Sequence, residues 1–448
     1  MIHRYKMNGF NIVLDVYSGG IHVVDDIVYD ILEFDINDKE NIQATLEYKY
    51  DVVEISEAIE EILELKKRGL LFTEDIYQEV LPQVDKRNPV VKALCLHIAH
   101  DCNLKCKYCF AEEGEYKGKR SLMSFEVGKA AIDFIIQNSA NRRNLEIDFF
   151  GGEPLMNLPV VKQIVAYGRE QEKLHNKVFR FTLTTNGVLL NEETEKYINE
   201  NMHNVVLSLD GRKIVNDTMR VTATGKSSYE IIVPKFQRLA ESRNQNNYYV
   251  RGTFTSENLD FSKDVLHMAD LGFQQVSIEP VVAPDAETYA IKREHIEIVF
   301  TEYENLALEL LQRKKEGQEF NFFHFMIDLT GGPCVAKRLV GCGAGTEYLA
   351  VTPEGELFPC HQFVGMEDFK MGHVSTGVSN VEKRKEFEKC NVYAKKECES
   401  CFAKFYCSGG CAANSYNTTG DINKPFSISC DLQRKRVECA IMMKVAEM

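Results

Sequence analysis

The chain of 448 residues has no run of 18 or more apolar residues. That absence excludes a membrane-spanning helix, and the first residues also lack the apolar core and cleavage site of a signal peptide. Basic residues are outnumbered, since 53 Lys and Arg against 67 Asp and Glu leave a formal net charge of −14. No basic stripe offsets this charge, which argues against nucleic acid as a partner. We therefore expect a cytoplasmic protein that binds neither membranes nor nucleic acids.

Cysteine, in contrast, is abundant, with 14 residues in the chain. Because no secretion signal is found, we do not interpret them as disulfide partners. Ten of them fall into two patterned sets, one of three residues and one of seven. The others are Cys95, Cys334, Cys390 and Cys439. Unpatterned cysteines are mostly small buried hydrophobes, which is our interpretation of all of these except Cys334.

The first set consists of Cys102, Cys106 and Cys109, with the spacing C-x3-C-x2-C. Each iron of a [4Fe–4S] cluster takes one protein ligand, so three thiolates leave one iron open to a small molecule with an amine and a carboxylate. A reduced cluster can pass an electron to a sulfonium bound there, and S-adenosyl-L-methionine (SAM) is such a sulfonium. A zinc loop completed by His97 or His100 is the alternative that the spacing leaves open.

An aromatic residue, Tyr108, directly precedes Cys109. With it, the cysteine run resembles the signature of the radical SAM superfamily. The resemblance implies that Cys102, Cys106 and Cys109 hold a [4Fe–4S] cluster and form the catalytic centre. It also implies SAM as a cofactor and a cellular one-electron donor as a partner.

Between residues 90 and 315, predicted strands alternate with predicted helices. The apolar strand candidates are residues 90–98, 145–150, 178–184, 205–209, 249–254 and 275–279. The helix candidates are residues 125–137 (with Ser124 as N-cap), 159–173, 192–201, 229–242 and 261–271. This order predicts an α/β fold, a parallel sheet curled into a partial (β/α)6 TIM-like barrel. Functional groups of such folds gather at the carboxyl ends of the strands, and the first cysteine set directly follows the first strand.

Glycine and polar residues follow the next three strands. They are Gly151-Gly152-Glu153-Pro154, the run 184–187 and the run 208–211, all of which are also ordinary turn compositions. The resemblance to radical SAM proteins implies that the first run holds the amine of SAM and that the other two lie near its ribose and carboxylate. It also implies that Arg220 pairs with that carboxylate. The residues expected to bind SAM are therefore Tyr108, Gly151, Gly152, Glu153, Thr185, Asn186, Ser208, Asp210 and Arg220.

The second cysteine set lies beyond the predicted barrel, in residues 316–448. It consists of Cys342, Cys360, Cys398, Cys401, Cys407, Cys411 and Cys430. Thiolate spacing alone suits zinc or iron–sulfur clusters. The interior C-x2-C-x5-C-x3-C run resembles the SPASM extension of peptide-modifying radical enzymes, which implies two auxiliary [4Fe–4S] clusters and three clusters in the whole chain.

The SPASM resemblance also implies how these cysteines are divided. One cluster would take Cys398, Cys401, Cys407 and Cys430, and the other Cys342, Cys360 and Cys411. Family members often add a fourth cysteine shortly before the first of the seven, and Cys334 lies eight residues before Cys342. Either Cys334 completes that cluster or one iron stays open for a substrate thiolate. We favour the open site.

Residues 1–75 are expected to form a separate module, joined to the barrel by a linker at residues 76–89. Turn signals at Asn8-Gly9 and Ser18-Gly19-Gly20 predict a three-stranded ribbon. A short helix at 27–32, an amphipathic helix at 53–67 stopped by Gly69, and an apolar strand or wing at 70–72 complete a predicted winged helix-turn-helix. Such modules often bind DNA, but the acidic side chains of the 53–67 helix would repel its phosphates.

The module resembles the peptide-recognition domain of enzymes that modify ribosomally made peptides. This implies that residues 1–75 bind the leader of a precursor peptide as an added strand at the edge of the ribbon. A structural cap on the enzyme is the alternative.

Taken together, these parts resemble the radical SAM–SPASM peptide maturases, and most closely the thioether-forming, sactisynthase-like maturases of SCIFF peptides. The resemblance implies a 5′-deoxyadenosyl radical that activates a substrate carbon, to which a cysteine sulfur then bonds. One alternative is a sulfatase-activating, formylglycine-type maturase, although such enzymes carry an acid where this chain has His361 and lack the N-terminal module. A non-catalytic iron–sulfur or zinc scaffold is the other.

Overall fold

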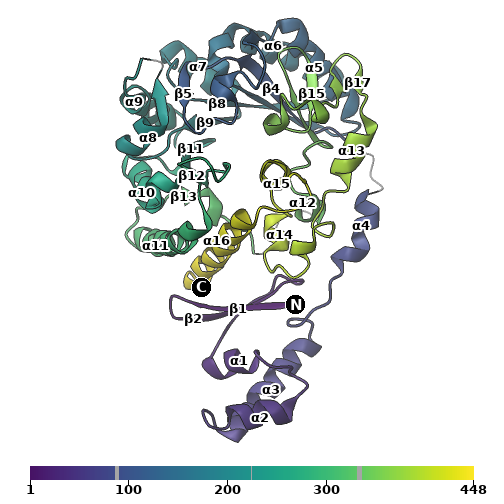
Figure 1. Ribbon diagram of the computed structural model, residues 1–448, viewed down its shortest axis with the longest axis vertical. Helices are drawn as coiled ribbons and strands as arrows, with labels where there is room; N and C mark the ends of the chain where they lie inside the picture. The colour runs from purple at the N-terminus through teal and green to yellow at the C-terminus, as the bar shows by residue number, and fades with distance from the viewer. Residues whose placement is uncertain (86–89, 223, 330–334) are drawn as a thin grey trace.

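The computed structural model describes residues 1–85, 90–222, 224–329 and 335–448. In Figure 1 the N-terminal part, in purple, projects from one end of the molecule, and the strands of the barrel lie toward the other end. Helix α16 (Ser427–Ala446), in yellow, runs beside α11 (Ile296–Lys315) between these two parts.

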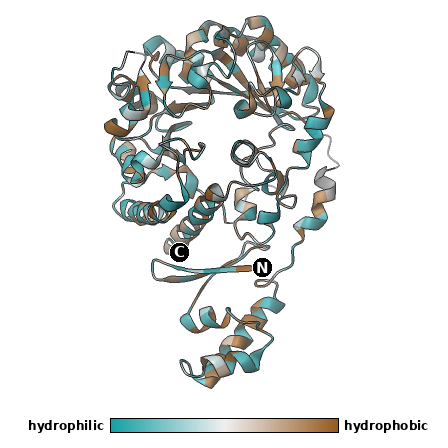
Figure 2. Cartoon of the chain, viewed as in Figure 1, coloured by the Kyte–Doolittle hydropathy of each residue, from teal (hydrophilic) through white to brown (hydrophobic). Residues whose placement is uncertain are grey.

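The N-terminal part contains the predicted three-stranded antiparallel ribbon. Its strands β1 (Ile2–Met7), β2 (Phe10–Asp15) and β3 (Ile21–Val24) are paired in the order β1-β2-β3. The helices that follow are α1 (Asp26–Ile31), α2 (Lys39–Leu46) and α3 (Val52–Lys67). Helix α3 begins with a capping box between Asp51 and Glu54, and its buried Ile55, Ile59 and Ile62 pack in one core with Val13 of β2. The helices of this part show hydrophobic and hydrophilic residues side by side in Figure 2.

One prediction for the N-terminal part is wrong. Residues 70–72 form a bend rather than a strand or wing, because Phe72 has a φ of 54°, outside the extended region that a strand needs. The predicted linker contains a helix, α4 (Tyr77–Asp85), whose Tyr77 ring lies edge-on to Phe405 with centroids 4.8 Å apart. Residues 86–89 lie outside the described residues.

The predicted parallel sheet is confirmed. Its six strands are β4 (Ala93–His100), β7 (Asn144–Gly151), β8 (Val178–Thr185), β9 (Asn204–Ser208), β11 (Tyr248–Phe254) and β12 (Gln275–Pro280). The helices between and after them are α5 (Phe125–Asn138), α6 (Leu158–His175), α7 (Glu192–Asn201), α8 (Lys213–Met219), α9 (Tyr229–Ser242), α10 (Phe261–Asp270) and α11. Ser124 caps α5 as expected, because its hydroxyl accepts from the Val127 amide.

The C-terminal part extends this sheet at both edges. Strand β13 (Asn321–Phe322) pairs in parallel with β12, and β14 (Tyr348–Val351) pairs in parallel with the other edge of β4. Strands β15 (Glu356–Phe358), β16 (Gly372–His373) and β17 (Gly377–Val378) continue beyond β14 in antiparallel fashion. The sheet therefore does not end at residue 315, where the sequence suggests the barrel stops.

Shorter elements complete the chain. Strands β5 (Leu104–Cys106), β6 (Ser121–Leu122) and β10 (Arg220–Thr222) lie in the barrel connections. The C-terminal part adds the helices α12 (Val335–Val340), α13 (Val381–Glu388), α14 (Lys404–Cys407) and α15 (Ala412–Thr419).

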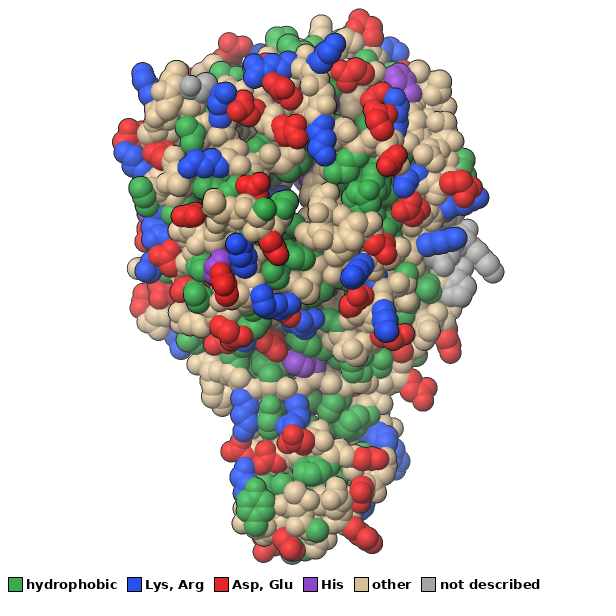
Figure 3. All heavy atoms as spheres, viewed as in Figure 1, with side chains coloured by type: hydrophobic (Ala, Val, Ile, Leu, Met, Phe, Trp, Pro, Cys, Tyr) green, Lys and Arg blue, Asp and Glu red, His purple; other side chains and the backbone are tan. Residues whose placement is uncertain are grey.

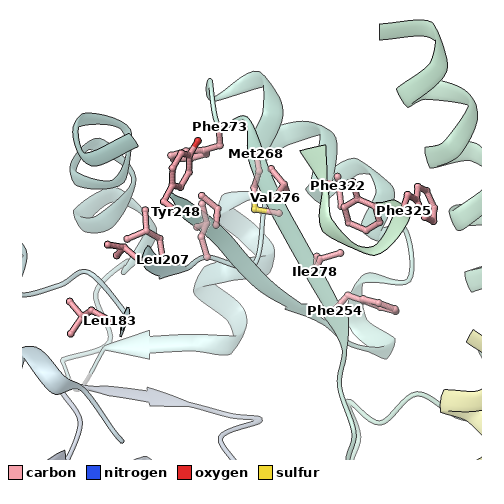
Figure 4. Packing of buried hydrophobic residues seen from close by; sticks show 14 of the residues in the cluster. Leu183, Leu207, Tyr248, Phe254, Met268, Phe273, Val276, Ile278, Phe322 and Phe325 are labelled. Atoms are coloured by element: carbon pink, nitrogen blue, oxygen red, sulfur yellow. The ribbon is translucent and has the colours of Figure 1, made fainter. Parts of the chain in front are cut away.

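One hydrophobic core joins the sheet to its covering helices. Figure 4 shows how Tyr248 and Phe254 of β11 and Val276 and Ile278 of β12 pack with residues from neighbouring elements, including Phe322 of β13. The outer surface is mixed in character: on the face in Figure 3, acidic and basic side chains are interspersed. Among the described residues, no helix is long and apolar enough to cross a membrane.

We predict that the barrel and β14 share one cooperative core. Leu349 of β14 is 1% exposed and lies opposite Leu94 of β4, so Leu349→Ala should lower the free energy of unfolding by about 2–5 kcal/mol. Leu174→Ala is the matched control, because Leu174 on α6 is 73% exposed and its loss should cost less than about 0.5 kcal/mol. Urea unfolding measures both values. Equal stability of the two variants would show that β14 is not part of the core.

Candidate active site and its neighbouring cysteine groups

A cavity of about 150 Å³ opens where β4, β7, β8 and β9 end. All three cysteines of the first set line it, so the structure brings the trio to the carboxyl end of the sheet as predicted. The other lining residues are Leu104, Tyr108, Phe110, Ala111, Gly114, Tyr116, Phe150, Gly151, Gly152, Thr184, Thr185, Asn186, Ser208 and Arg220. Of the nine residues expected to bind SAM, only Glu153 and Asp210 do not line the cavity.

The loop that carries the trio is held by a short antiparallel pairing. Strand β5 ends at Cys106, which lies opposite Arg220 of β10. Arg220 donates from Nη1 toward the Cys106 sulfur at 3.9 Å. Burial raises the pKa of the Cys106 thiol to about 11, and the positive charge of Arg220 opposes this rise. Arg220 is thus placed to favour a thiolate at Cys106.

Asp210 stabilises the same loop without lining the cavity. Its carboxylate is fully buried and accepts from the Tyr108 hydroxyl at 2.6 Å, from Arg220 Nε at 3.1 Å and from the Thr253 amide at 3.0 Å. Charge-assisted bonds of this kind are strong and directional. Asp210 therefore positions Tyr108, which lies between the second and third cysteines, and Arg220, which lies opposite Cys106, and does not itself line the cavity.

Gly151 and Gly152 make room beside the trio. A Cβ on Gly152 would lie 2.1 Å from the carbonyl oxygen of Asp101, and one on Gly151 would lie 2.4 Å from that of Ala99. Gly151 also has a φ of 118°, which favours glycine. The end of β7 can approach the trio loop this closely only because both positions lack a side chain.

Glu153 differs in environment from what the resemblance implies. Its carboxylate is 1% exposed and accepts from the Leu155 amide at 3.0 Å, the Thr185 hydroxyl at 2.8 Å and the Asn186 amide at 2.8 Å. Burial raises the pKa of Glu153 to about 7, against the effect of these donors. The side chain joins the ends of β7 and β8, and its expected contact with the amine of SAM stays a prediction.

Asn186 links the end of β8 to the trio. Its side-chain amide donates to Asn103 Oδ1 at 2.7 Å and toward the Cys102 sulfur at 3.6 Å. Ser208 and Thr185 line the cavity beside it. These polar residues therefore lie where the sequence predicts them, although Asn186 also has a structural contact within the trio loop.

Three aromatic residues of the cavity were not predicted. The Tyr116 hydroxyl donates to the Gly151 carbonyl oxygen at 3.0 Å, while Phe110 and Phe150 lie across from the C-terminal part. Phe150 directly precedes the two glycines, which is the one sequence signal that could have identified it. Phe110 and Tyr116 lie in an irregular connection without a periodic pattern.

The two histidines considered as zinc ligands are turned toward each other. His97 Nδ1 and His100 Nε2 are 3.0 Å apart, and both rings contact Tyr116. Neither lines the cavity. In the described part of the chain, no three His, Cys, Asp or Glu side chains converge on one metal-ion position.

The second cysteine set separates into two groups in space. Burial raises the pKa of Cys360, and the nearby Cys411 and Cys342 raise it further. Burial likewise raises the pKa of Cys407 to about 12, with contributions from Cys430, Cys398 and Cys401. The structure thus brings together the same two groups that the SPASM resemblance implies. Cys334 lies outside the described residues.

His361 connects the cavity to the first of these groups. It follows Cys360, and its ring lies 5.7 Å from that of Phe110 and 5.0 Å from that of Phe150, centroid to centroid. The Tyr348 hydroxyl is 3.4 Å from His361 Nδ1. The rings of Phe110 and Phe150, which line the trio cavity, therefore lie against the residue that follows Cys360.

Comparisons with known proteins agree with these two centres. Residues 91–233 match a family model described as a 4Fe-4S single cluster domain, and residues 342–402 match the SPASM iron–sulfur cluster-binding domain. The chain is 22% identical to the radical SAM cyclopropyl synthase TigE of Paramaledivibacter caminithermalis, over 95% of this chain and 91% of that one. It is 23% identical to a cysteine-type anaerobic sulfatase-maturating enzyme of Clostridium novyi, over 70% and 86%. The chain is thus similar to radical SAM–SPASM proteins, and both matched models describe iron–sulfur cluster domains.

Two solved structures share this fold. The structure of anSMEcpe with bound AdoMet superposes with a TM-score of 0.68 at 20% identity, over 80% of this chain and 95% of that one. Streptococcus suis SuiB bound to S-adenosylmethionine superposes with a TM-score of 0.53 at 14% identity, over 95% and 98%. The N-terminal part is thus included in the match to SuiB.

We predict that the Tyr108 hydroxyl stabilises the trio loop through Asp210. Tyr108→Phe keeps the ring but removes the donor to a buried carboxylate, which should lower the free energy of unfolding by about 1.5–3 kcal/mol. Tyr48→Phe is the control, since Tyr48 is 82% exposed and should change stability by less than about 0.5 kcal/mol. Urea unfolding compares the two. A Tyr108→Phe variant as stable as the control would contradict the bracing role of Asp210.

Proposed function

We propose that this protein is a radical SAM–SPASM enzyme that installs a thioether crosslink between a cysteine sulfur and a backbone or side-chain carbon of a ribosomally made, cysteine-rich precursor peptide. The observation that carries the proposal is the contact of Phe110 and Phe150, which line the trio cavity, with His361, which directly follows Cys360. A substrate bound beside these rings would lie between the residues proposed to hold SAM and the Cys360 group.

The residues around the trio fit a [4Fe–4S] cluster with SAM. When bound, this pair supplies a 5′-deoxyadenosyl radical that removes a hydrogen atom from a substrate carbon. Cys102, Cys106 and Cys109 would provide the thiolates, and Arg220 would favour the ionised form of Cys106. Gly151 and Gly152 let the end of β7 pack closely against the backbone of Ala99 and Asp101, and both line the cavity next to this loop.

The remaining expected contacts with SAM are also part of the proposal. Thr185, Asn186 and Ser208 would bind its polar groups from the ends of β8 and β9. Tyr108 and Asp210 would keep the trio loop and Arg220 in place. The aromatic rings of Phe110, Tyr116 and Phe150 would exclude water from the reacting carbon.

The share of this chain that each relative matches favours peptide crosslinking over sulfatase activation. TigE and SuiB match 95% of this chain, whereas the matches to anaerobic sulfatase-maturating enzymes and to anSMEcpe cover 70 to 80% of it. SuiB has been solved bound to its precursor peptide SuiA, and a cyclopropyl synthase activity is named for TigE. The N-terminal part of this chain, which we propose spans residues 1–75, is the added segment. His361, where the sulfatase-activating enzymes carry an acid, also favours different chemistry.

We propose that the N-terminal part binds the leader along β3. A groove of about 430 Å³ lies between helix α3 and the start of helix α1, which directly follows β3. The groove is lined by five carboxylates, those of Asp25, Asp26, Glu54, Glu57 and Glu61. The other lining residues are Ile27, Val28, Tyr50 and Ala58. A leader that combines apolar side chains with Lys or Arg would complement this groove.

The N-terminal part is held against the SPASM part, which would place a bound leader close to the reaction centre. The His3 ring stacks on Phe402 with centroids 3.5 Å apart, and the Tyr5 hydroxyl donates to the Glu438 carbonyl oxygen at 2.9 Å. Lys404 lies 3.6 Å from the Asp75 carboxylate. These contacts join β1 and the end of the module to the C-terminal cysteine region.

The cluster content gives the first test of this function. Anaerobic reconstitution should yield about twelve irons per chain if the trio and both SPASM groups each hold a [4Fe–4S] cluster. The variant with Cys102, Cys106 and Cys109 all changed to Ala should lose about four of them, together with all reductive cleavage of SAM. Cys439→Ala is the control, because this buried cysteine lies outside both sets and should leave the iron content unchanged. SAM cleavage that persisted in the triple variant would contradict the trio assignment.

A second test addresses the leader. The double change Glu57→Lys and Glu61→Lys reverses two groove charges and should weaken binding of the precursor peptide at least tenfold, about 1.4 kcal/mol. Glu60→Lys with Glu64→Lys makes the same change in net charge on α3 outside the groove and should have little effect. Fluorescence anisotropy with a labelled peptide measures both. Equal affinities of the two variants would show that the groove does not bind the leader and would favour the structural cap. Separately, a formylglycine product would favour sulfatase-type chemistry.

A further inference from the structure

Lys395 is a buried lysine in the SPASM part whose charge is not balanced by an acid. Its side chain belongs to a residue only 2% exposed, and its ammonium donates to the Gly409 carbonyl oxygen at 2.7 Å. Within the ranges that the structure describes, no Asp or Glu forms an ion pair with it. A buried charge without a partner is costly, so this ammonium must be compensated by the groups around it.

The ammonium is held in the segment that carries cysteines of both SPASM groups. Gly409, its acceptor, is two residues from Cys407 of one group and two residues from Cys411 of the other. A single buried charge therefore lies next to both groups.

The backbone keeps Lys395 in this position. Its carbonyl oxygen accepts from the Cys398 amide at 2.9 Å, and its acceptor Gly409 lies between Cys407 and Cys411 in the chain. The side-chain carbon Cδ lies 3.4 Å from where a Cβ of Gly409 would be. The lysine is thus fixed at both ends to segments that carry the thiols.

Two other buried lysines show what compensation normally looks like in this protein. Lys404, 3% exposed, lies 3.6 Å from the Asp75 carboxylate and 4.8 Å from the centre of the Tyr17 ring. Lys177, 8% exposed, donates to two carbonyl oxygens, and burial lowers its pKa. Lys395 has one carbonyl acceptor, in the segment between Cys407 and Cys411, and none of the described Asp or Glu residues forms an ion pair with it.

We propose that Lys395 is a shared counter-charge for the two auxiliary clusters and raises the reduction potential of both. A cluster with thiolate ligands becomes more negative on reduction, and its potential depends on net charge and on hydrogen bonds near its sulfurs. A buried ammonium stabilises the reduced form more than the oxidised form. The inference rests on the cluster content of the proposed function and adds a residue that controls the electron affinity of the SPASM part.

A redox titration tests this positioning role. In the full chain with Cys102, Cys106 and Cys109 changed to Ala, only the two auxiliary clusters contribute to the electron paramagnetic resonance spectrum. Adding Lys395→Met, which keeps the length of the side chain but removes its charge, should lower the equilibrium constant for reduction at least tenfold at both clusters. For a one-electron couple this is a fall of about 59 mV in each midpoint. A smaller shift at either cluster overturns the shared role.

Two further variants separate charge from structure. Lys395→Arg keeps the charge and should leave both midpoints close to those of the parent, and Lys177→Met removes a buried lysine far from the thiols and should move neither. If Lys395→Met fails to hold iron, the iron content of Lys395→Arg decides between charge and structure. Full iron content in Lys395→Arg supports the counter-charge role, and loss of iron in it overturns that role. Iron is measured first in the unmodified chain. About four irons there would overturn the cluster content of the proposed function and this inference with it, whereas about twelve irons with unmoved midpoints would overturn the inference alone.

Discussion

Backbone pairing along both edges of β4 is the constraint on which the rest of the molecule depends. All eight of its residues are buried, and it pairs in parallel with β7 on one side and with β14 on the other. The trio loop leaves from its carboxyl end, the glycines follow β7, and Cys360 follows the hairpin that begins with β14. The catalytic loop, its ligand space and the first SPASM group are therefore positioned by one set of hydrogen bonds.

Much of the barrel could be predicted because its physical signal is local. Parallel strands buried on both faces appear as short apolar runs, and the residues at their ends supplied most of the cavity lining. Helix α2 was not predicted, since only Ile42 and Leu46 of its eight residues are buried and give too little periodicity. The bend at Phe72 depends on its positive φ angle, which the apolar residues around it do not predict.

The site also contains relations that no linear pattern carries. Asp210 and Glu153 were expected to bind a ligand, yet each is buried among several protein donors and braces a loop. Phe110, Tyr116 and Lys395 acquire their surroundings only when distant segments come together. Cysteine spacing, in contrast, is itself the physical signal of a cluster, which explains why both sets were identified from the chain alone.

The contacts of β1 with the SPASM part have a consequence for substrate choice. Because His3 and Tyr5 fasten the ribbon to Phe402 and Glu438, the distance from β3 to the trio cavity is set by the protein and not by a flexible tether. An extended peptide spans at most about 3.3–3.6 Å per residue. With a leader docked as proposed, a precursor could present only residues far enough from the leader to cross this fixed span. The span would then set a minimum spacing between the leader and the first crosslinked position.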